Sequence, residues 1–140
     1  MDPLPEDVCK FLEGTNLAHF VTLMKDGSPH VTPVWVDHDG VHVLINTVEG
    51  HQKLRNLRRD PRVAVSVSDR DNAGRYVQVR GRVVEIVTGD VAVEHIHKVS
   101  RKYSGDPNRD YRLREGEERV LLKIEPEHVV YRAGFGGGRR

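Results

Sequence analysis

Residues 44–65 read LINTVEGHQKLRNLRRDPRVAV, and this stretch decides the fold expected for the chain. It begins with an apolar strand pattern, passes into a short basic helix and returns to alternating valines. Asp60 followed by Pro61 ends the helix, which we expect over residues 51–59. A strand, a helix and a second strand therefore follow one another with little chain between them.

Apolar alternation and turn residues on both sides of this stretch predict a chain made mostly of strands. Further helices are expected only at residues 5–13 and 90–103, where apolar residues recur every three or four positions. Strands are expected at residues 17–23, 29–36, 41–45, 63–68, 76–87, 119–124 and 129–131.

Some details of the strand pattern bear on topology. We expect the first three strands to form a meander, because only tight Asp-Gly turns at Gly27 and Gly40 separate them. Gly81 is expected to mark a bulge or a close approach of two backbones. Pro126 is expected to stop the preceding strand, because proline has no N–H to donate. Many strands and few helices predict the mainly β class, as a β-barrel with peripheral helices.

Length, composition and charge set limits on organisation and partners. The chain has 140 residues, 37% of them hydrophobic, so we expect a single domain over residues 1–133 and a disordered Gly and Arg tail at 134–140. The net charge of +1 gives no global field toward nucleic acid or membrane, and no aromatic platform interleaves with the basic run. The N-terminus resembles neither a signal peptide nor a membrane span. Cys9 is the single cysteine, so no intrachain disulfide forms and a cytoplasmic location is expected.

Although the net charge is small, basic residues cluster at the start of the helix expected over residues 51–59. Residues 46–62 hold five Lys and Arg against two acids. Free N–H groups at a helix start attract anions, and Lys53 adds a point charge in the first turn. A phosphate could therefore lie beside Thr47, His51 and Lys53. For the other members of the basic run, the alternative that they only solvate an outer face stays open.

Several motifs together resemble one known family. They are Asn46-Thr47 with KLRNLRRDPRV at 53–63, DGSP at 26–29 ahead of PVW at 33–35, YVQVRG at 76–81, and YSG at 103–105 ahead of RVLL at 119–122. In this order and spacing, which cover nearly the whole chain, they are similar to the pyridoxamine 5'-phosphate oxidase-like split-barrel superfamily. Within that superfamily they resemble the F420-dependent oxidoreductase branch.

The resemblance implies a split β-barrel like that of FMN-binding proteins, assembled as a homodimer with coenzyme sites at the subunit interface. The cofactor-binding residues that it implies are Val34, Trp35, Ile45, Asn46, Thr47, His51, Lys53, Arg55, Asn56, Tyr76 and Gln78. Those at 51, 53 and 56 would hold the phosphate, and those at 34–35 and 45–47 would lie along the ring. Tyr76 and Gln78 would come from the partner subunit.

The activity implied by the resemblance is hydride transfer from reduced coenzyme F420, a deazaflavin, to a small conjugated acceptor such as a quinone or a tetrapyrrole. No catalytic side chain and no metal is expected, because the coenzyme brings the chemistry. Arg55, Arg58 and Arg59 are compatible with the polyglutamate tail that F420 carries beyond its phosphate. Two alternatives stay open: an FMN-binding oxidoreductase of the same family, and an F420-binding carrier with little turnover.

The chain departs from the family pattern at two places. His51 stands where many relatives place an arginine that grips phosphate with a bidentate fork, which bears on phosphate affinity and its pH dependence. The C-terminal segment lacks the Arg-rich, Trp-containing end of true pyridoxamine phosphate oxidases, so oxidation of that vitamer is not expected. Trp35, placed within an expected strand, is expected to fill the barrel rather than stack on a ring.

Overall fold

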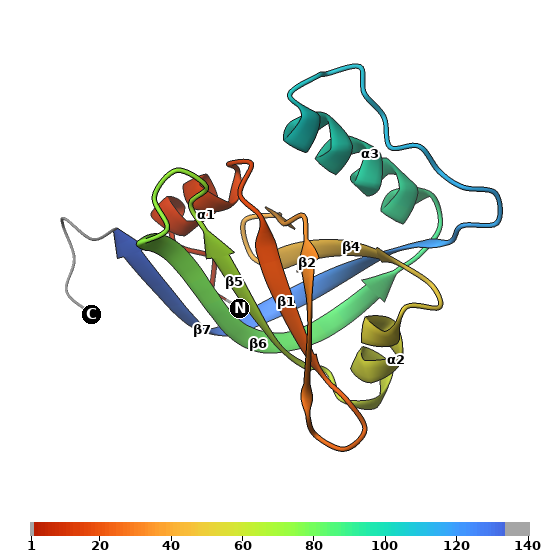
Figure 1. Cartoon of the computed structure of the whole chain (residues 1–140), viewed down its shortest axis with the longest axis horizontal. Helices are drawn as coiled ribbons and strands as arrows, with labels where there is room; N and C mark the ends of the chain where they lie inside the picture. The colour runs from red at the N-terminus through yellow and green to blue at the C-terminus, as the bar shows by residue number, and fades with distance from the viewer. Residues whose placement is uncertain (1, 134–140) are drawn as a thin grey trace.

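The structure, a computed structural model, describes residues 2–133, so the predicted tail at 134–140 lies outside the described residues. The elements follow in the order α1 (Glu6–Leu12), β1 (Ala18–Leu23), β2 (Pro29–Val34), β3 (Asp37–His38), β4 (Val43–Val48), α2 (Gln52–Arg59), β5 (Arg62–Ser68), β6 (Arg75–Val87), α3 (Asp90–Ser104) and β7 (Arg119–Ala133). The predicted mainly β class with peripheral helices is confirmed (Figure 1). None of the helices within residues 2–133 is long and apolar enough to span a membrane.

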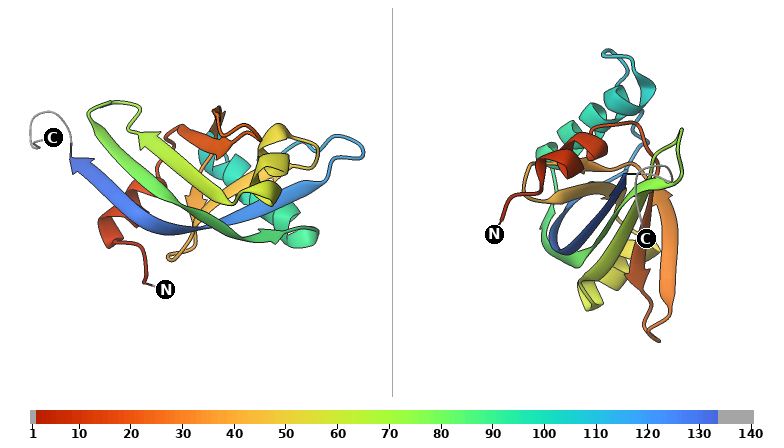
Figure 2. Two further views of the ribbon diagram at one scale, coloured as in Figure 1. Left: turned by 90° about the horizontal axis from the view of Figure 1, so that it is seen from below. Right: turned by 90° about the vertical axis from the view of Figure 1, so that its left-hand side faces the viewer.

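The strands form one antiparallel sheet in the order β2-β1-β5-β6-β7-β4-β3. The sheet curls strongly, so that its two halves face each other across the core (Figure 2). Strands β2 and β3 are its two edges, although only Trp35 and Val36 separate them along the chain. Because no ladder joins these edges within residues 2–133, the barrel has an open seam beside β2 and β4.

The core lies inside the curl, where alternate strand residues meet. In β5 the side chains of Val63, Val65 and Val67 are buried while their neighbours face outward, as the period of two requires. Helix α1 closes one end of the curl by burying Phe11 and Leu12 in the same core. Each such apolar side chain contributes about 1.5–3 kcal/mol on burial, so the valine-rich strands and α1 support one another.

The predicted three-stranded meander is wrong beyond its first hairpin. Strands β1 and β2 pair as expected, but β4 pairs with β7 and β3 instead of β2. The third expected strand also shifts from residues 41–45 to Val43–Val48. Alternation along a strand shows which face is buried but not which strand lies beside it. Consequently Asn46 and Thr47 lie within a strand and not at the strand-to-helix junction.

The predicted stop at Pro126 is also wrong, because β7 continues through it to Ala133. Two features make the proline tolerable there. Beyond Ile124, β7 pairs with β6 but no longer with β4. The edge of β7 that faced β4 therefore needs no main-chain N–H donor at Pro126. On the other side Pro126 lies opposite Gly81, next to a register shift in the ladder. The predicted bulge or close approach at Gly81 is thereby confirmed.

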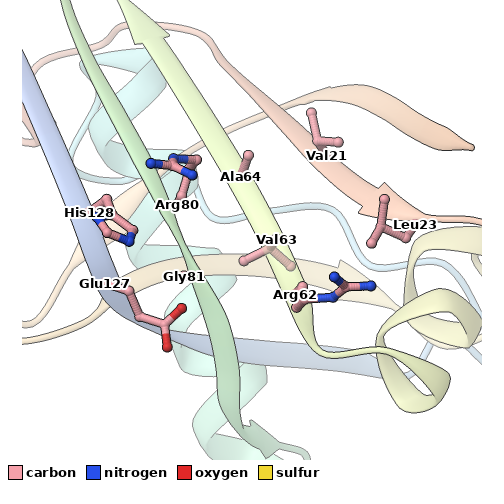
Figure 3. A pocket seen from close by; sticks show the side chains of 9 residues that line it. All are labelled: Val21, Leu23, Arg62, Val63, Ala64, Arg80, Gly81, Glu127 and His128. Atoms are coloured by element: carbon pink, nitrogen blue, oxygen red, sulfur yellow. The ribbon is translucent and has the colours of Figure 1, made fainter. Parts of the chain in front are cut away.

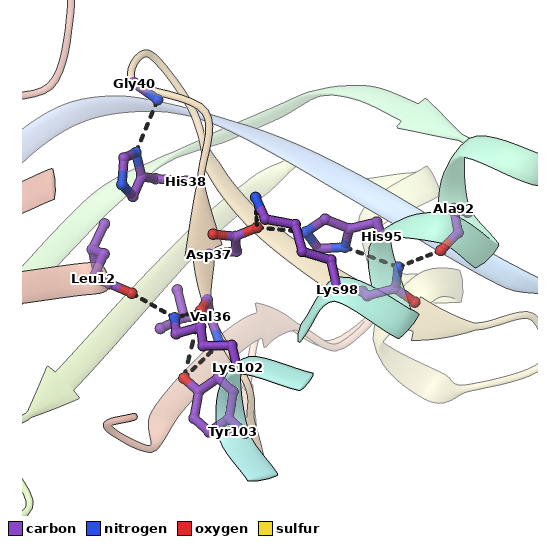
Figure 4. Close-up of polar contacts among 11 residues, drawn as sticks. Leu12, Val36, Asp37, His38, Gly40, Ala92, His95, Lys98, Lys102 and Tyr103 are labelled. Carbon is purple, nitrogen blue, oxygen red and sulfur yellow. Dashed lines mark hydrogen bonds and ion pairs between the residues drawn. The ribbon is translucent and has the colours of Figure 1, made fainter. Parts of the chain in front are cut away.

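Helix α3 is attached to the rest of the molecule by buried polar contacts (Figure 4). Lys102 Nζ donates to the carbonyl oxygens of Leu12 at 2.6 Å and Val36 at 2.7 Å. The Tyr103 hydroxyl accepts from the Val36 N–H at 3.0 Å and donates to the Asn16 carbonyl at 2.7 Å. Burial lowers the pKa of Lys102 to about 8. These bonds fix the C-terminal half of α3 against the link between β2 and β3.

A second set of contacts fixes the N-terminal half of α3. His95 and Lys98 lie 3.0 Å and 3.2 Å from the carboxylate of Asp37 on β3. Burial opposes the charge of Asp37, but the bond to His95, the His38 N–H and the charge of Lys98 outweigh it. Together they hold the pKa of Asp37 well below its usual range. His95 therefore has a structural role in attaching α3 to β3.

Gly81→Ala is predicted to destabilise the fold by roughly 1–3 kcal/mol or more, because overpacking a fixed backbone forces main-chain shifts. A Cβ at this position would overlap the carbonyl oxygen of Glu125 on β7. Urea denaturation of the variant measures the free energy of unfolding. Val84→Ala, an exposed change on the same strand, is the control and should stay near the wild type. Equal stability of both variants would contradict the close approach.

Candidate functional site

The open seam between β2 and β4 contains a cavity of about 160 Å³, which we call the basic cavity. Its lining comes from β2 and the following link, from β4, from the start of α2, and from α3, the loop after it and β7. The lining residues are Pro33, Val34, Trp35, Asn46, Thr47, Val48, His51, Lys53, Ile96, Val99, Tyr111 and Arg119. No carboxylate belongs to this set.

Unpaired strand edges border the basic cavity. Strand β3 pairs with β4 only at Val43 and Leu44, so the side of β4 from Ile45 to Val48 that faces the seam has no strand partner within residues 2–133. Strand β2 likewise pairs only with β1. Main-chain donors and acceptors on such edges are free to bond a flat heterocyclic ligand.

The cationic end of the cavity is built where α2 begins. His51 immediately precedes α2, and Lys53 lies in its first turn, nine-tenths buried with 9% of its surface exposed. The first N–H groups of a helix and a nearby cation attract anions. Thr47 Oγ1 lies 3.5 Å from His51 Nδ1, so β4 and the helix start face the same space.

Arg119 completes the cationic end from the opposite side. It begins β7 opposite Val48 of β4, and its side chain is only 6% exposed. Its guanidinium pairs with Glu117 at 2.7 Å, donates to Asn46 Oδ1 at 2.9 Å and lies 4.8 Å from the centre of the Tyr111 ring. The guanidinium is therefore held in one place by groups from two different segments.

The charges in the basic cavity are only partly balanced by acids, because Glu117 pairs with Arg119 alone. Lys53 forms no ion pair within residues 2–133, and its pKa is lowered by burial and then by Arg119. The pKa of His51 is lowered by burial and by the charges of Lys53 and Arg119, only partly opposed by Glu117. Buried cations that repel one another are favourable only where an anion joins them. These residues fit a phosphate group.

Six of the predicted cofactor residues meet in this cavity, and five do not line it. Those that meet are Val34, Trp35, Asn46, Thr47, His51 and Lys53. The Ile45 side chain points into the core. Asn56 is fully buried, and it donates to Thr22 Oγ1 at 3.0 Å and accepts from Gln52 at 2.8 Å. Asn56 thus joins α2 to β1.

The remaining predicted residues lie further away. Arg55 is exposed on α2 and donates to the Gly50 carbonyl and to Gln52. Tyr76 and Gln78 are on β6, which is separated from β2 in the sheet by β1 and β5. The Gln78 side chain is exposed. Their predicted role in a partner subunit's site stays a prediction.

Sequence reasoning missed Arg119 and Tyr111, and it misjudged Trp35. The two missed residues follow the cavity's β4 residues by more than sixty positions, and nothing in their local pattern distinguishes them from ordinary loop and strand residues. Trp35 does not fill the barrel, because β2 ends at Val34 and the indole remains 37% exposed. It stacks on Tyr103 with ring centres 5.2 Å apart.

A second hollow, of about 330 Å³, lies on the sheet across β1, β5, β6 and β7 (Figure 3). Val21, Ala64 and Arg80 are in register in one row of this surface. Their neighbours Phe20 and Val65 are buried, so the row belongs to the outer face of the sheet. The hollow therefore lies on the opposite side of the sheet from the core.

The curled antiparallel sheet with an open seam defines the class of split β-barrel proteins. The profile described as Pyridoxamine 5'-phosphate oxidase matches residues 4–133, and the chain belongs to this family.

The relatives agree with the branch predicted from the sequence. The chain is 28% identical over 130 residues to an F420H(2)-dependent biliverdin reductase of Mycobacterium tuberculosis (strain CDC 1551 / Oshkosh), covering 91% of this chain and 87% of that protein. A solved structure named F420 Reductase is 31% identical with a TM-score of 0.77, covering 91% and 98% of the two chains. A conserved hypothetical protein from Mycobacterium tuberculosis is 26% identical with a TM-score of 0.72, covering 92% and 84%. The resemblance to the F420-dependent branch is confirmed.

Lys53→Met is predicted to remove sulfate binding without unfolding the chain. Sulfate should raise the free energy of unfolding of the wild type by mass action and leave that of the variant unchanged. Without sulfate the variant should be more stable by roughly 1 kcal/mol, since an apolar chain replaces a buried, unpaired ammonium. Thermal and urea unfolding with and without sulfate measure both effects. Lys25→Met, in the exposed β1–β2 turn, is the control.

The same anion site should be pH-dependent through His51. Because its pKa is lowered in the folded chain, the unfolded chain binds the proton more strongly. The free energy of unfolding should then fall as the pH drops below about 6.5, the ordinary histidine value. Sulfate, which favours the protonated imidazole, should offset this loss, so its stabilising effect should be larger at pH 6 than at pH 8. An effect independent of pH would contradict a role of His51 in anion binding.

Proposed function

We propose that the chain is an F420-dependent oxidoreductase, which passes a hydride from reduced deazaflavin to a small conjugated acceptor such as a quinone or a tetrapyrrole. The observation that supports this most strongly is the basic cavity, where unbalanced cations stand at one end and open strand edges at the other. The two relatives named for F420 support the choice of coenzyme.

Lys53, Arg119 and the N–H groups at the start of α2 hold the coenzyme phosphate. Arg119 is held by Glu117 and Asn46 before any ligand binds, so its charge is already fixed in the cavity lining. A charged hydrogen bond of this kind contributes about 1.5–3 kcal/mol. His51 adds a donor, and in its protonated form also a charge.

The ring end of the coenzyme lies along β2 and β4. Val34 and Trp35 provide apolar contact on one side, and the free main-chain groups of Ile45 to Val48 provide hydrogen bonds on the other. The reduced deazaflavin supplies the hydride when it is bound, while the protein orients it and excludes water. No nucleophilic side chain is required for this chemistry.

The outer arginines of α2 favour F420 over FMN. Arg58 pairs with Glu49 at 2.6 Å, whereas Arg55 and Arg59 form no ion pair in the described part of the chain. These two guanidinium groups lie on the helix whose first turn holds the phosphate. They are available to the acidic tail that F420 carries and FMN lacks. FMN remains the alternative coenzyme of the same site.

A homodimer would complete the site. At about 160 Å³ the basic cavity is smaller than the roughly 300–1,000 Å³ usual for ligand pockets, so part of the ring lies outside it in a single chain. The outer face of the sheet carries the apolar Val21 and the hollow beside it, together with the exposed Ser66 and Gln78, which are in register. This face is the proposed contact with a second copy, and Gln78 then contributes to the partner's site.

The wild type is predicted to bind F420 more tightly than FMN, and Lys53→Met should weaken F420 binding about 10- to 100-fold, the equivalent of one lost charged hydrogen bond. Titration of the coenzyme-free protein, followed by deazaflavin fluorescence, measures the affinity. Lys25→Met should bind as the wild type does. Tighter binding of FMN than of F420 would select the alternative coenzyme, and an unchanged affinity in Lys53→Met would disprove the phosphate site.

Ser66→Glu is predicted to convert the protein from a dimer into a monomer, because it places like charges opposite each other on the contact face. Light scattering should give about twice the chain mass of 15.9 kDa for the wild type and a single chain mass for the variant. Asn108→Glu adds the same charge in the exposed loop after α3 and should remain dimeric. A monomeric wild type would exclude the proposed assembly.

A further inference from the structure

A larger cavity lies next to the basic cavity, and we call it the arginine groove. Its volume is about 610 Å³, and it opens between the α1–β1 link, the β5–β6 loop, α3 and the loop that follows α3. Its lining residues are Thr15, Leu17, Trp35, Arg70, Ser100, Tyr103, Ser104 and Arg109. Trp35 also lines the basic cavity, so one indole separates the two spaces.

One wall of the arginine groove is a fixed aromatic pair. Trp35 stacks on Tyr103 with 15° between the ring planes. The Tyr103 hydroxyl is bonded to main-chain groups of Val36, as Figure 4 shows, and also to the Asn16 carbonyl. Leu17, which is 48% exposed, adds an apolar surface to the same groove. Exposed apolar side chains gathered along a groove mark a place where a ligand binds, and this wall suits a flat conjugated molecule.

The groove is also positively charged. Arg70 and Arg109 both line it, and no carboxylate does. Arg70 is held toward the groove by its Nη1 bond to Thr15 Oγ1 at 3.2 Å and by its N–H bond to Asn16 at 3.0 Å. Neither guanidinium forms an ion pair within residues 2–133.

Two acids adjacent to these arginines in the sequence pair with other arginines, and Asp71, which follows Arg70, forms no ion pair within residues 2–133. Asp69 pairs with Arg75 at 3.3 Å, and Asp110 pairs with Arg101 at 2.6 Å. The two groove arginines therefore keep their donors for a ligand. A guanidinium fork matches a carboxylate group, and an acceptor without one would leave both forks with water only.

We propose that the arginine groove binds the electron acceptor, and that this acceptor is a flat conjugated molecule bearing at least one carboxylate. The conjugated part lies against Trp35 and Leu17, and the carboxylate lies between Arg70 and Arg109. The inference rests on the proposed function in one respect: because Trp35 borders both cavities, a molecule in the groove lies beside the coenzyme ring. Neutral acceptors fit the apolar wall alone and bind more weakly, and cationic ones are repelled.

The test measures binding without any coenzyme. The probes are biliverdin, a conjugated tetrapyrrole with two propionate groups, and its dimethyl ester, which has the same chromophore without the charge. Trp35 is the single tryptophan of the chain and borders both cavities, so quenching of its fluorescence reports binding in either one, and the variants below assign the site. Biliverdin should bind the wild type about 10- to 100-fold more tightly than the ester, as expected for one charged hydrogen-bonded contact.

The double variant Arg70→Gln, Arg109→Gln should lose this difference, by weakening the acid while leaving the ester unchanged. Arg112→Gln, in the exposed loop and outside the groove lining, is the matched control and should keep the difference. Equal binding of acid and ester to the wild type would overturn the proposal. So would an unchanged acid affinity in the double variant, or an equally large loss in Lys53→Met, which would locate the probe in the basic cavity.

Failure of this inference is distinguishable from failure of the proposed function. F420 affinity, measured separately by deazaflavin fluorescence, should be the same in the double variant as in the wild type. If biliverdin binds more tightly than its ester while F420 does not bind at all, the groove is an anion-selective ligand site and the coenzyme assignment is wrong. If F420 binds and the groove shows no discrimination, only the groove proposal fails.

Discussion

The attachment of helix α3 to residues 36–38 determines the geometry of both cavities. Lys102 and Tyr103 bond main-chain groups of Val36, and His95 with Lys98 contacts the carboxylate of Asp37. Removing one partner of a buried hydrogen bond costs roughly 1–3 kcal/mol, because the other partner is left unsatisfied. The link between β2 and β3 is therefore rigid, and the indole that it carries stands as a fixed wall between two spaces.

The second constraint is the seam that the sheet leaves open. Seven strands of this length curl far enough to enclose a core but not to join β2 to β4, so the edges of both strands keep unsatisfied main-chain groups. Edges of this kind invite pairing with other chains unless something covers them. Here α3 covers part of the seam, and the basic cavity occupies the rest. The same opening thus provides a cavity that needs no insertion into the fold.

Local patterning predicted the elements well and their neighbours poorly. The alternation in β5 and the Asp-Pro end of α2 depend only on residues close in sequence, and both were predicted correctly. The path of β7 through Pro126 depends on Gly81 opposite it, and pairing of that kind has no local signature. For the same reason Lys53 was recognised from its place at a helix start, whereas Arg119 was not. Asn56 differs from both, since its place in the family motif implies a ligand contact while its buried side chain joins α2 to β1, so its role toward a coenzyme stays a prediction.

The position of Arg119 also explains how His51 fits a phosphate site. A second guanidinium at position 51 would lie in the same small cavity as Lys53 and Arg119, and like charges at such distances repel strongly where water is scarce. The imidazole reduces this repulsion, because its lowered pKa favours the neutral form. Arg119, whose Nη1 pairs with Glu117 and whose Nε donates to Asn46, meanwhile supplies a fixed charge on the other side of the seam, and its Nη2 has no partner within residues 2–133. The departure at position 51 is therefore compatible with phosphate binding, because the guanidinium comes from β7 instead of α2.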